Sequence, residues 1–599
     1  MSTSEGSEGA YQKLGPEQRV FIEYLEDSQV IVERKIFAYQ EYTELIISHI
    51  TVKRVQSTLL GSINIPVVIH EEKESDDFIF NVANTKDYTF FDGTTKQVEN
   101  NQFQSEKLKV YIYYTPLPVD GLELNENETT KTFVFVTSMD TSNQTAKKSF
   151  DYATTLINEN RFDYFYETQV QLWNQIWSNG RIDIEGDEDL QRQINSAYYY
   201  LLSSLPALHT KSDKKQFYGL SPGSLSRGGK LGEDYGGHSF WDTETWMYPA
   251  ILMFYPTLAK DILSYRIALK DSAIDNAIIF NYTGWRFPWE SARTGVDVTP
   301  ECCPEDAQPF KNNSVYTNAI ASLSIDLANR VSCITNKIVP SQWLDVANNL
   351  YFPFDSQLQI YLEYEHFNIQ TAKIKQADVV LLDFPLMWPM NETVRRNNLL
   401  MYENITRDDG PAMTWSMHAV GFLELNDIAK AEHLFRRSYQ TYVRPPFNVW
   451  TEARSGVGAV NFITGAGGFL QSVLFGYGGI RLRFEQLEFF PTLPPGTNTF
   501  TFYGLKYLGS TFDVKMDSKQ YELSVIEMNN QNIELSYDYG GQQGKLKGIN
   551  DRISVPIKTR LTIRSIDTIC KETTNKAITT RIQNLLMQLT MFCIYLFRH

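Results

Sequence analysis

The sequence predicts a multi-domain protein of mixed α and β class, in which two sheet regions flank a long helical region. Near both ends of the chain, apolar residues alternate with polar ones, as they do in the strands of antiparallel sheets. In the middle they recur every three or four residues, as on one face of a helix. We therefore expect an N-terminal antiparallel β-sandwich, a helical centre and a small C-terminal β-sheet domain.

The change of periodicity sets the expected domain boundaries. The runs RVFIEYL, QVIVERKIFAY and TFVFVTS are β-branched and aromatic segments, and Asp, Gly and Asn turns separate such runs. The helical pattern includes LQRQINSAYYYLLSSL, ETVRRNNLLMYENI and MTWSMHAVGFLEL. The expected divisions are a disordered tail at 1–16, a β-sandwich at 17–150, linker helices at 151–187, the helical domain at 188–480, the C-terminal β-sheet domain at 481–565 and a divergent tail at 566–599.

Composition excludes several classes of partner. A formal net charge of -16 and a pI of about 5.1 leave no broad basic face for a phosphate backbone, so no nucleic acid is expected. The five cysteines show neither a disulfide framework nor a zinc spacing, and the N-terminus lacks a signal-peptide pattern, so we expect a cytoplasmic protein. The apolar run LLMQLTMFCIYLF is shorter than the roughly 20 residues that cross a bilayer, so no membrane anchor is expected.

Four segments carry polar side chains that suit carbohydrate, and in three of them aromatic residues stand beside the acids. They are GGHSFWDTETWMYP (236–249), GWRFPWESARTG (284–295), KQADVV (375–380) and VWTEARSG (449–456). Sugar rings stack on aromatic planes, and sugar hydroxyls need many hydrogen-bond partners. Glycosidic cleavage also uses one carboxylic acid to protonate the leaving oxygen and one carboxylate to activate water or attack carbon. The acids available for such roles are Asp242, Glu244, Glu290 and Glu452.

Each of these segments also has a purely structural interpretation. A loop acid can cap a helix or pair with Arg286 or Arg454. His238 has no second histidine at metal-ligand spacing, so it is expected to be a hydrogen-bonding loop residue, and no metal is expected. The glycines of the segment 465–468 do not follow a strand as a phosphate loop requires, which indicates close backbone packing between helices.

Taken together, the ordered motifs resemble glycoside hydrolase family 65, in its animal, acid-trehalase-like branch. The resemblance rests on the segments above together with NNSVYTN, GPAMTWSMHAVGFLEL and the continuation VGAVNFITGAGGFLQSVLFGY, and it runs from about residue 160 to 510. It implies a β-sandwich, a linker, an (α/α)6 barrel at 188–480 and a C-terminal sheet domain. It also implies inverting hydrolysis of an α-glucosidic bond, without a cofactor.

The family's motifs assign a role to each candidate residue. By this resemblance Glu452 is the general base that activates water, and its presence weighs against the phosphorylase branch. The residues expected to hold the non-reducing glucose are Trp241, Asp242, Trp289, Glu290, Lys375 and Gln376, and Glu244 is a further substrate-binding candidate from its place beside them. For the animal branch the implied partner is a small saccharide or glycosylated hydroxylysine, namely the glucosyl-galactosyl-hydroxylysine of collagen.

The sequence departs from the family where the general acid should stand. The family carries this Glu in a loop of the form SPDEYH before the NN-x-YTN helix start, but here PEDAQPFK precedes Asn312. The sequence therefore predicts no general acid and a barrel one helical hairpin short. A second departure, the absence of the family's Asn-Gly/Leu-Gly-Arg signature at the front of the sandwich, predicts a sandwich that is only partial. Glu301, Glu305 and Asp306 lie near this junction and are candidates to substitute for the acid.

Three functions remain open at this point. The first is the α-glucosidase of the family, and the second is a catalytically silent sugar-binding protein that lacks the acid. The third is an α-glucoside phosphorylase or a trehalase. Release of glucose, binding without turnover and phosphate-dependent cleavage would distinguish them.

Overall fold

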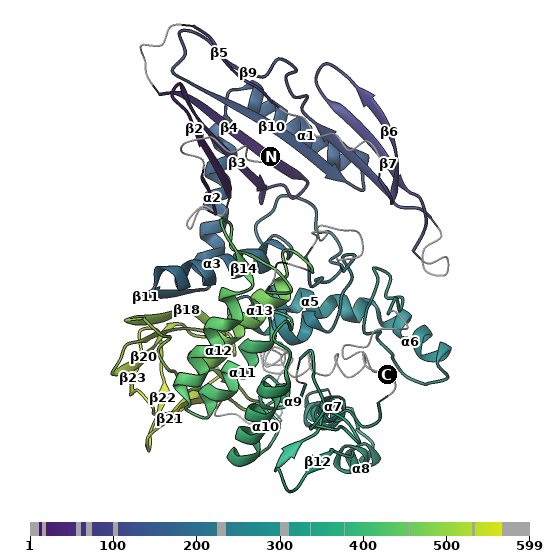
Figure 1. Ribbon diagram of the computed structural model, residues 1–599, viewed down its shortest axis with the longest axis vertical. Coiled ribbons are helices and arrows are strands. Elements are labelled where there is room, and N and C mark those ends of the chain that lie inside the picture. The colour runs from purple at the N-terminus through teal and green to yellow at the C-terminus, as the bar shows by residue number, and fades with distance from the viewer. Residues whose placement is uncertain are drawn as a thin grey trace. The chain divides into compact units, whose positions relative to one another are not determined.

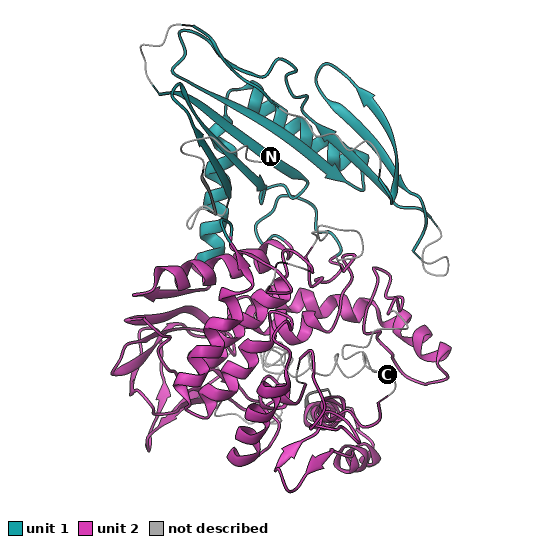
Figure 2. Cartoon of the chain, in the orientation of Figure 1, with its two compact units in different colours: residues 1–177, 207–216, 445–447 teal, residues 178–206, 217–444, 448–599 magenta. Residues whose placement is uncertain are grey.

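The computed structural model describes residues 11–14, 20–55, 61–67, 75–99, 106–224, 235–299, 311–335, 337–376, 378–454, 456, 458–529 and 533–565. The chain divides into two compact units (Figure 2). Unit 1 contains residues 1–177, 207–216 and 445–447, and unit 2 contains residues 178–206, 217–444 and 448–599.

Unit 1 is built on an eight-stranded antiparallel sheet with the strand order β1-β2-β3-β4-β10-β8-β7-β6 (Figure 1). A separate two-stranded sheet pairs β5 with β9, and two helices follow the strands. The bounds are β1 Tyr11–Leu14, β2 Phe21–Glu26, β3 Val30–Ala38, β4 Leu45–Arg54, β5 Ile63–Ile65, β6 Phe78–Asn84, β7 Thr89–Thr95, β8 Lys109–Tyr114, β9 Leu122–Leu124, β10 Thr130–Asp140, α1 Asn143–Asn158 and α2 Phe162–Asn179.

The two faces of the large sheet are covered by different elements. Helix α1 begins after its cap Ser142, and its stripe of Ala146, Phe150 and Ala153 packs in one core cluster with Ile47 of β4. Val52 of β4 belongs instead to a second cluster with the strands of the small sheet. Because residues an odd number apart in a strand point to opposite faces, α1 and the small sheet cover opposite sides.

This arrangement corrects two details of the predicted sandwich. The sequence predicted two packed sheets over 17–150, whereas the described residues form one large sheet whose main covering layer is a helix. The helix begins at Asn143, inside the range predicted as sheet. The physical reason is that a helix with an apolar stripe buries the inner face of a sheet as well as a second sheet does.

Unit 2 contains the helical region and the C-terminal strands (Figure 1). Its first strand and helix are β11 Arg181–Glu185 and α3 Glu188–Ser203. The other helices are the π-helical turn η1 Thr243–Met247, α4 Tyr248–Leu252, α5 Pro256–Ala268, α6 Lys270–Ile279, α7 Val315–Thr335, α8 Ser341–Asn349, α9 Asp378–Asp383, α10 Glu392–Ile405, α11 Thr414–Glu424, α12 Ile428–Gln440, α13 Ile463–Gln471 and the π-helical turn η2 Ser472–Tyr477. Two short hairpins interrupt them, β12 Phe354–Asp355 with β13 Ile360–Tyr361, and β14 Val443–Arg444 with β15 Val449–Trp450.

The C-terminal strands form two five-stranded sheets, with the orders β11-β18-β19-β20-β23 and β16-β17-β24-β21-β22. Their bounds are β16 Arg481–Leu482, β17 Gln486–Phe489, β18 Thr499–Tyr507, β19 Ser510–Met516, β20 Gln520–Glu527, β21 Leu535–Tyr539, β22 Gln542–Leu546, β23 Arg552–Pro556 and β24 Leu561–Ser565. The segment 151–187 was predicted as helices only, but its end is strand β11, which pairs with β18. Gly504 permits this approach, since its φ is +77° and a Cβ there would lie 2.3 Å from the Asn179 carbonyl oxygen.

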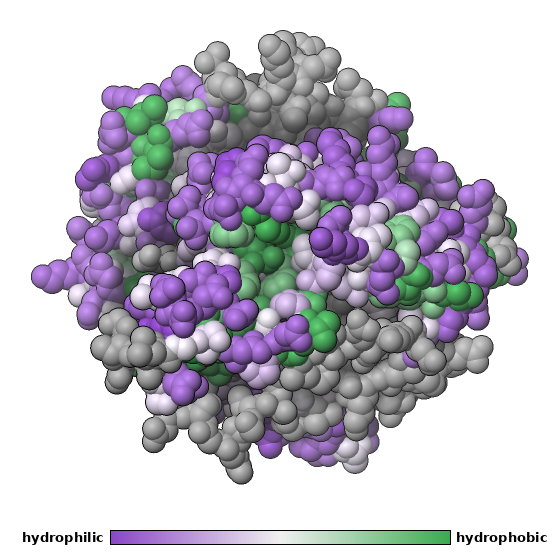
Figure 3. All heavy atoms as spheres, turned by 90° about the horizontal axis from the view of Figure 1, so that it is seen from above, coloured by the Kyte–Doolittle hydropathy of each residue, from purple (hydrophilic) through white to green (hydrophobic). Residues whose placement is uncertain are grey.

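Hydrophilic side chains dominate the described surface seen in Figure 3, and hydrophobic side chains gather in a strip near its centre. Large apolar side chains that are exposed on unit 1 include Ile46, Ile79 and Val82.

Among the described residues, none of the helices combines the length and the apolar character needed to span a membrane. Glu301, Glu305 and Asp306, the residues near the predicted loss of the acid loop, lie outside the described residues.

Candidate active site

Asp242 stands at the start of the π-helical turn η1, which continues directly into α4. Its side chain accepts a hydrogen bond of 2.8 Å from the Thr464 hydroxyl, which α13 supplies from more than two hundred residues further along the chain. Only 6% of Asp242 is exposed. Burial raises the pKa of the Asp242 carboxyl to about 7; the charge of Glu452 adds to this shift, and Thr464 and Lys375 oppose it.

Helix α13 fixes the turn that carries Asp242. A π-helical turn shifts the backbone hydrogen-bond register, which leaves carbonyl groups in need of donors. The Gln471 side-chain amide donates to the carbonyl oxygens of Thr245 and Trp246, at 2.8 and 2.7 Å. At Gly467 an added Cβ would lie 2.4 Å from the Trp246 carbonyl oxygen. The predicted close packing at the glycines of 465–468 is therefore confirmed, and it serves to press α13 against η1.

Glu452 lies just after β15, on a loop held by backbone hydrogen bonds. Its N–H donates to the Ala459 carbonyl, and its carbonyl accepts from the Ala412 N–H, both at 3.0 Å. One carboxylate oxygen accepts a 3.4 Å bond from the Ala459 N–H, and the Lys375 ammonium lies 3.7 Å from the other. The side chain is 20% exposed. A carboxylate anchored in this way and still open to solvent can contact a water molecule.

Lys375 and Gln376 occupy the connection that leads into α9. Ile374, the preceding residue, forms an isolated parallel bridge with Thr406, which anchors this connection to the end of α10. The Lys375 ammonium contacts Glu452, and its charge opposes the rise in the pKa of Asp242 that burial causes. The structure therefore brings Asp242, Lys375 and Glu452 into one electrostatic cluster from three distant parts of the chain.

The PWES segment is tied to the segment that precedes Asp242. Trp289 packs edge-on against Phe240, with ring centroids 5.0 Å apart. Nδ1 of His238 lies 2.7 Å from a Glu290 carboxylate oxygen, which agrees with the hydrogen-bonding role predicted for this histidine. Ser239 and Ser291, the neighbours of these residues, exchange two backbone hydrogen bonds of 3.0 and 2.8 Å.

Trp241 and Glu244 are the most deeply buried of the predicted site residues. The Trp241 ring packs edge-on against Trp246 and Tyr316, at centroid distances of 6.1 and 5.6 Å. Glu244 is fully buried, and both of its carboxylate oxygens accept hydrogen bonds from Arg266. Burial raises the pKa of Glu244, while the guanidinium of Arg266 acts in the opposite direction. Within this structure, Glu244 contacts Arg266 rather than the Asp242 cluster.

The structure adds residues that the sequence reasoning did not select. Thr464, Arg266 and His418 are polar and buried at or near the site. His418 lines a small cavity with Gln376 and Trp246, about large enough for one water molecule. Its ring stacks on Trp415, and burial lowers its pKa to about 3. The motifs FITGAGGF and GPAMTWSMH contained two of these residues, but only the fold shows where their side chains point.

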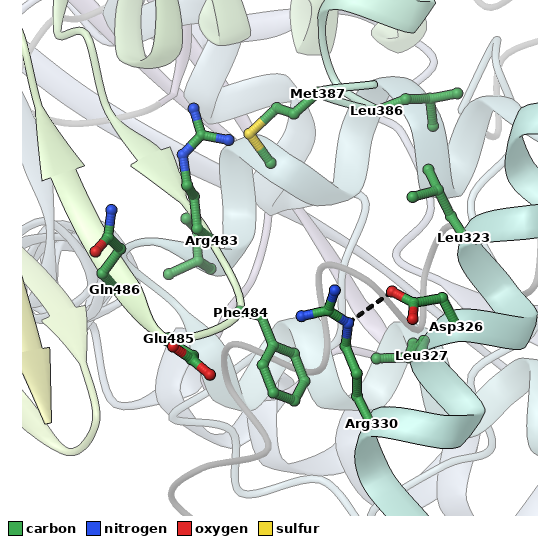
Figure 4. Close-up of a pocket in the computed structure, with 11 residues that line it drawn as sticks. Leu323, Asp326, Leu327, Arg330, Leu386, Met387, Arg483, Phe484, Glu485 and Gln486 are labelled. Atoms are coloured by element: carbon green, nitrogen blue, oxygen red, sulfur yellow. Dashed lines mark hydrogen bonds and ion pairs between the residues drawn. The ribbon is translucent and has the colours of Figure 1, made fainter. Parts of the chain in front are cut away.

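A pocket of about 320 Å³ lies apart from these residues, between α7, the segment after α9 and the β16–β17 hairpin (Figure 4). Of its charged residues, Arg330 pairs with Asp326 at 2.6 Å, and Arg483 pairs with Glu488 at 2.8 Å. None of the predicted site residues lines it. No group of three or more potential metal ligands occurs among the residues that the structure describes.

Sequence comparisons place the chain in one family. Residues 223–311 match the glycosyl hydrolase family 65 central catalytic domain, and residues 480–538 match the family's C-terminal domain. The protein-glucosylgalactosylhydroxylysine glucosidase of Danio rerio is 33% identical, over 88% of this chain and 89% of the relative. The enzyme of the same name from Dictyostelium discoideum is also 33% identical, over 83% of this chain and 78% of the relative.

A solved structure supports the same fold. The putative kojibiose phosphorylase from human microbiome superposes with a TM-score of 0.67 at 14% identity, covering 92% of this chain and 86% of that chain. Its likeness concerns the fold alone. On the sequence relationships, this chain belongs to glycoside hydrolase family 65, a family of glycosidases, and its homologues include α-glucosidase-type hydrolases. The resemblance seen in the motifs is thereby confirmed.

Proposed function

We propose that this chain is an inverting glycosidase that releases glucose from a terminal α-glucosidic bond. The cluster of Asp242, Lys375 and Glu452 carries the proposal, because it places one solvent-accessible carboxylate beside a buried one. In this proposal Glu452 is the general base. Its carboxylate accepts a proton from the attacking water, while Lys375 and the Ala459 N–H hold its two oxygens in place.

The proposed glucose site surrounds this base. Asp242 accepts hydrogen bonds from glucose hydroxyls, and its buried position strengthens them because little water competes there. Lys375 and Gln376 approach the sugar from the α9 side, and Trp289 offers a partly exposed ring for stacking. Trp241 and Glu290 support these contacts from the two joined segments. No cofactor or metal is part of this mechanism.

The proposed substrate is the glucosyl-galactosyl-hydroxylysine unit. The name shared by relatives that are one-third identical supports this choice, since it states a glucosidase acting on that glycosylated residue. The proposed scaffold is an (α/α)6 barrel formed by the helices of 188–480, one hairpin shorter than the family standard. The tightly packed pair of α13 and η1 in this region supports that arrangement.

A second candidate is a sugar-binding protein without turnover. The observation that favours it is the sequence PEDAQPFK directly before NNSVYTN, where the family places its acid loop. Such a protein would keep the glucose contacts but would leave the departing alkoxide without a proton. General acid assistance is worth about 10² to 10⁴ in rate, so its loss would reduce turnover by that factor.

One experiment separates these functions. The purified chain is incubated with glucosyl-galactosyl-hydroxylysine, with and without phosphate, and free glucose and glucose 1-phosphate are measured; glucose affinity is measured by calorimetry. We expect glucose release that does not need phosphate. Glu452→Gln should abolish release while glucose still binds, and the exposed Glu485→Gln serves as a control.

The other outcomes assign the alternatives. Glucose binding without release by the wild-type chain would favour the silent sugar-binding protein. Phosphate-dependent formation of glucose 1-phosphate would identify a phosphorylase. Full release by Glu452→Gln would refute the assigned base.

A further inference from the structure

Arg266 on α5 connects two segments of the proposed glucose site, the one that leads to Asp242 and the one that carries Glu290. Its Nε and Nη2 donate to the two carboxylate oxygens of Glu244, at 2.5 and 3.1 Å. Nη2 also donates to the Phe240 carbonyl oxygen at 2.9 Å, and Nη1 donates to the Ser291 hydroxyl at 3.3 Å. Only 1% of Arg266 is exposed. One planar guanidinium thus contacts three separate groups: a carboxylate, a backbone carbonyl and a side-chain hydroxyl.

Two of these contacts are next to proposed sugar-binding residues. Phe240 comes two positions before Asp242, so its carbonyl belongs to the backbone segment that leads into the η1 turn. Ser291 directly follows Glu290. The same two segments meet at the Ser239–Ser291 bridge. Arg266 therefore fixes the separation and orientation of the two segments, through its bonds to Phe240 and Ser291.

Stability alone does not explain a buried pair of this kind. Removing two charges from water is costly, and apolar residues of similar volume often replace a buried ion pair with no loss of stability. A guanidinium, however, offers five donors in a rigid plane, which an apolar side chain or the single ammonium of lysine cannot reproduce. The distinctive property of Arg266 is therefore its geometry.

We propose that Arg266 is a positioning residue of the sugar site and that Glu244 acts by holding Arg266 rather than by contacting sugar. The pair sets the position of Asp242 relative to Glu290, and the bound sugar spans the two segments. This inference rests on the proposed function for the identity of the sugar as glucose. It gives Glu244 a different role from Asp242, the other acid of its motif.

The test compares two double variants. Glu244→Met/Arg266→Met replaces the pair with apolar side chains of similar length. Glu424→Met/Arg481→Met is the matched control, because Arg481 is also buried and donates to Glu424 at 2.8 Å, and neither residue belongs to the proposed site. Tm and glucose affinity are measured for both, and KM and kcat are measured wherever the wild type releases glucose.

We expect the Glu244/Arg266 double variant to keep a Tm close to that of its control and to bind glucose about tenfold more weakly, the effect of about 1.4 kcal/mol from lost orientation. Arg266→Lys should show the same loss of affinity, since lysine keeps the positive charge but lacks the planar set of donors of the guanidinium. In an active enzyme the loss should appear in KM more than in kcat.

Wild-type glucose affinity in a folded Glu244/Arg266 double variant would overturn the inference, as would an equal loss of affinity in the control. The proposed function fails separately if the wild-type chain binds glucose and releases none, because the affinity comparison still tests Arg266. A wild-type chain without affinity for glucose would refute both.

Discussion

Replacing Asp242 with Asn should stabilise the protein at alkaline pH while weakening its affinity for glucose. The Asp242 carboxyl is buried, and its pKa is raised from 3.8 to about 7, first by burial and then by the charge of Glu452. The Asn side chain has a similar shape, and its carbonyl oxygen can still accept the Thr464 hydrogen bond. The substitution therefore removes a buried charge with little change in packing.

The sign and size of the effect follow from linkage. Because the folded state binds this proton more tightly than the unfolded state, stability is highest at low pH and falls as pH rises from about 4 to about 7. A difference of about 3 units, at 1.36 kcal/mol for each, corresponds to about 4 kcal/mol above pH 7. About 3 kcal/mol of that loss falls between pH 5 and pH 8. Asp242→Asn lacks this loss.

The assay is thermal unfolding of wild type and Asp242→Asn at pH 5 and pH 8. The Tm advantage of the variant should be larger at pH 8 by about 3 °C, allowing for the size of unit 2. The exposed Asp345→Asn is the control and should follow the wild type at both pH values. A variant whose Tm changes with pH as the wild type's does would refute the reasoning that Asp242 is destabilised by its buried charge.

The remaining predictions concern two glycines and a histidine. Gly467→Ala should destabilise the protein by about 2 kcal/mol or more, because its Cβ would meet the Trp246 carbonyl oxygen of η1. Gly548→Ala is the control: a Cβ there has no neighbour within 4 Å, so Tm should stay within about 1–2 °C of wild type. Gly458→Ala should lower turnover at least tenfold, because the new Cβ would lie 2.9 Å from the Glu452 carboxylate and would displace it. Gly541→Ala is the control, since Gly541 has the same positive φ but no neighbour within 4 Å. An equal loss of turnover in Gly541→Ala would contradict this explanation. His418→Leu should make the protein more resistant to acid. Burial lowers the pKa of the His418 imidazole to about 3, so the wild type loses stability as pH falls below about 6.5, by about 3 kcal/mol at pH 4.5. Urea unfolding measures this loss, and an equal loss in the variant would exclude His418 as its cause.

The sequence predicted the order of sheets and helices because those patterns are local. The helix expected from ETVRRNNLLMYENI is α10 at the same residues, Glu392–Ile405, since its Asn391 cap and apolar spacing are written within a few residues. The membership of the family was also readable, because its loops combine rare residue types in a fixed order. The location of β11 was not readable, since its partner β18 lies more than three hundred residues away.

For the candidate site, the sequence by itself determined which acids, aromatics and glycines were available and in which motifs they stand. Only the tertiary structure decided that Lys375 reaches Glu452, that Thr464 donates to Asp242, and that Glu244 turns toward Arg266. The reason is physical: these contacts join segments far apart in the chain, and the pKa of Asp242 depends on the water and the charges that folding removes or brings near. A motif specifies the carboxyl group, but burial and its neighbours determine what that group does.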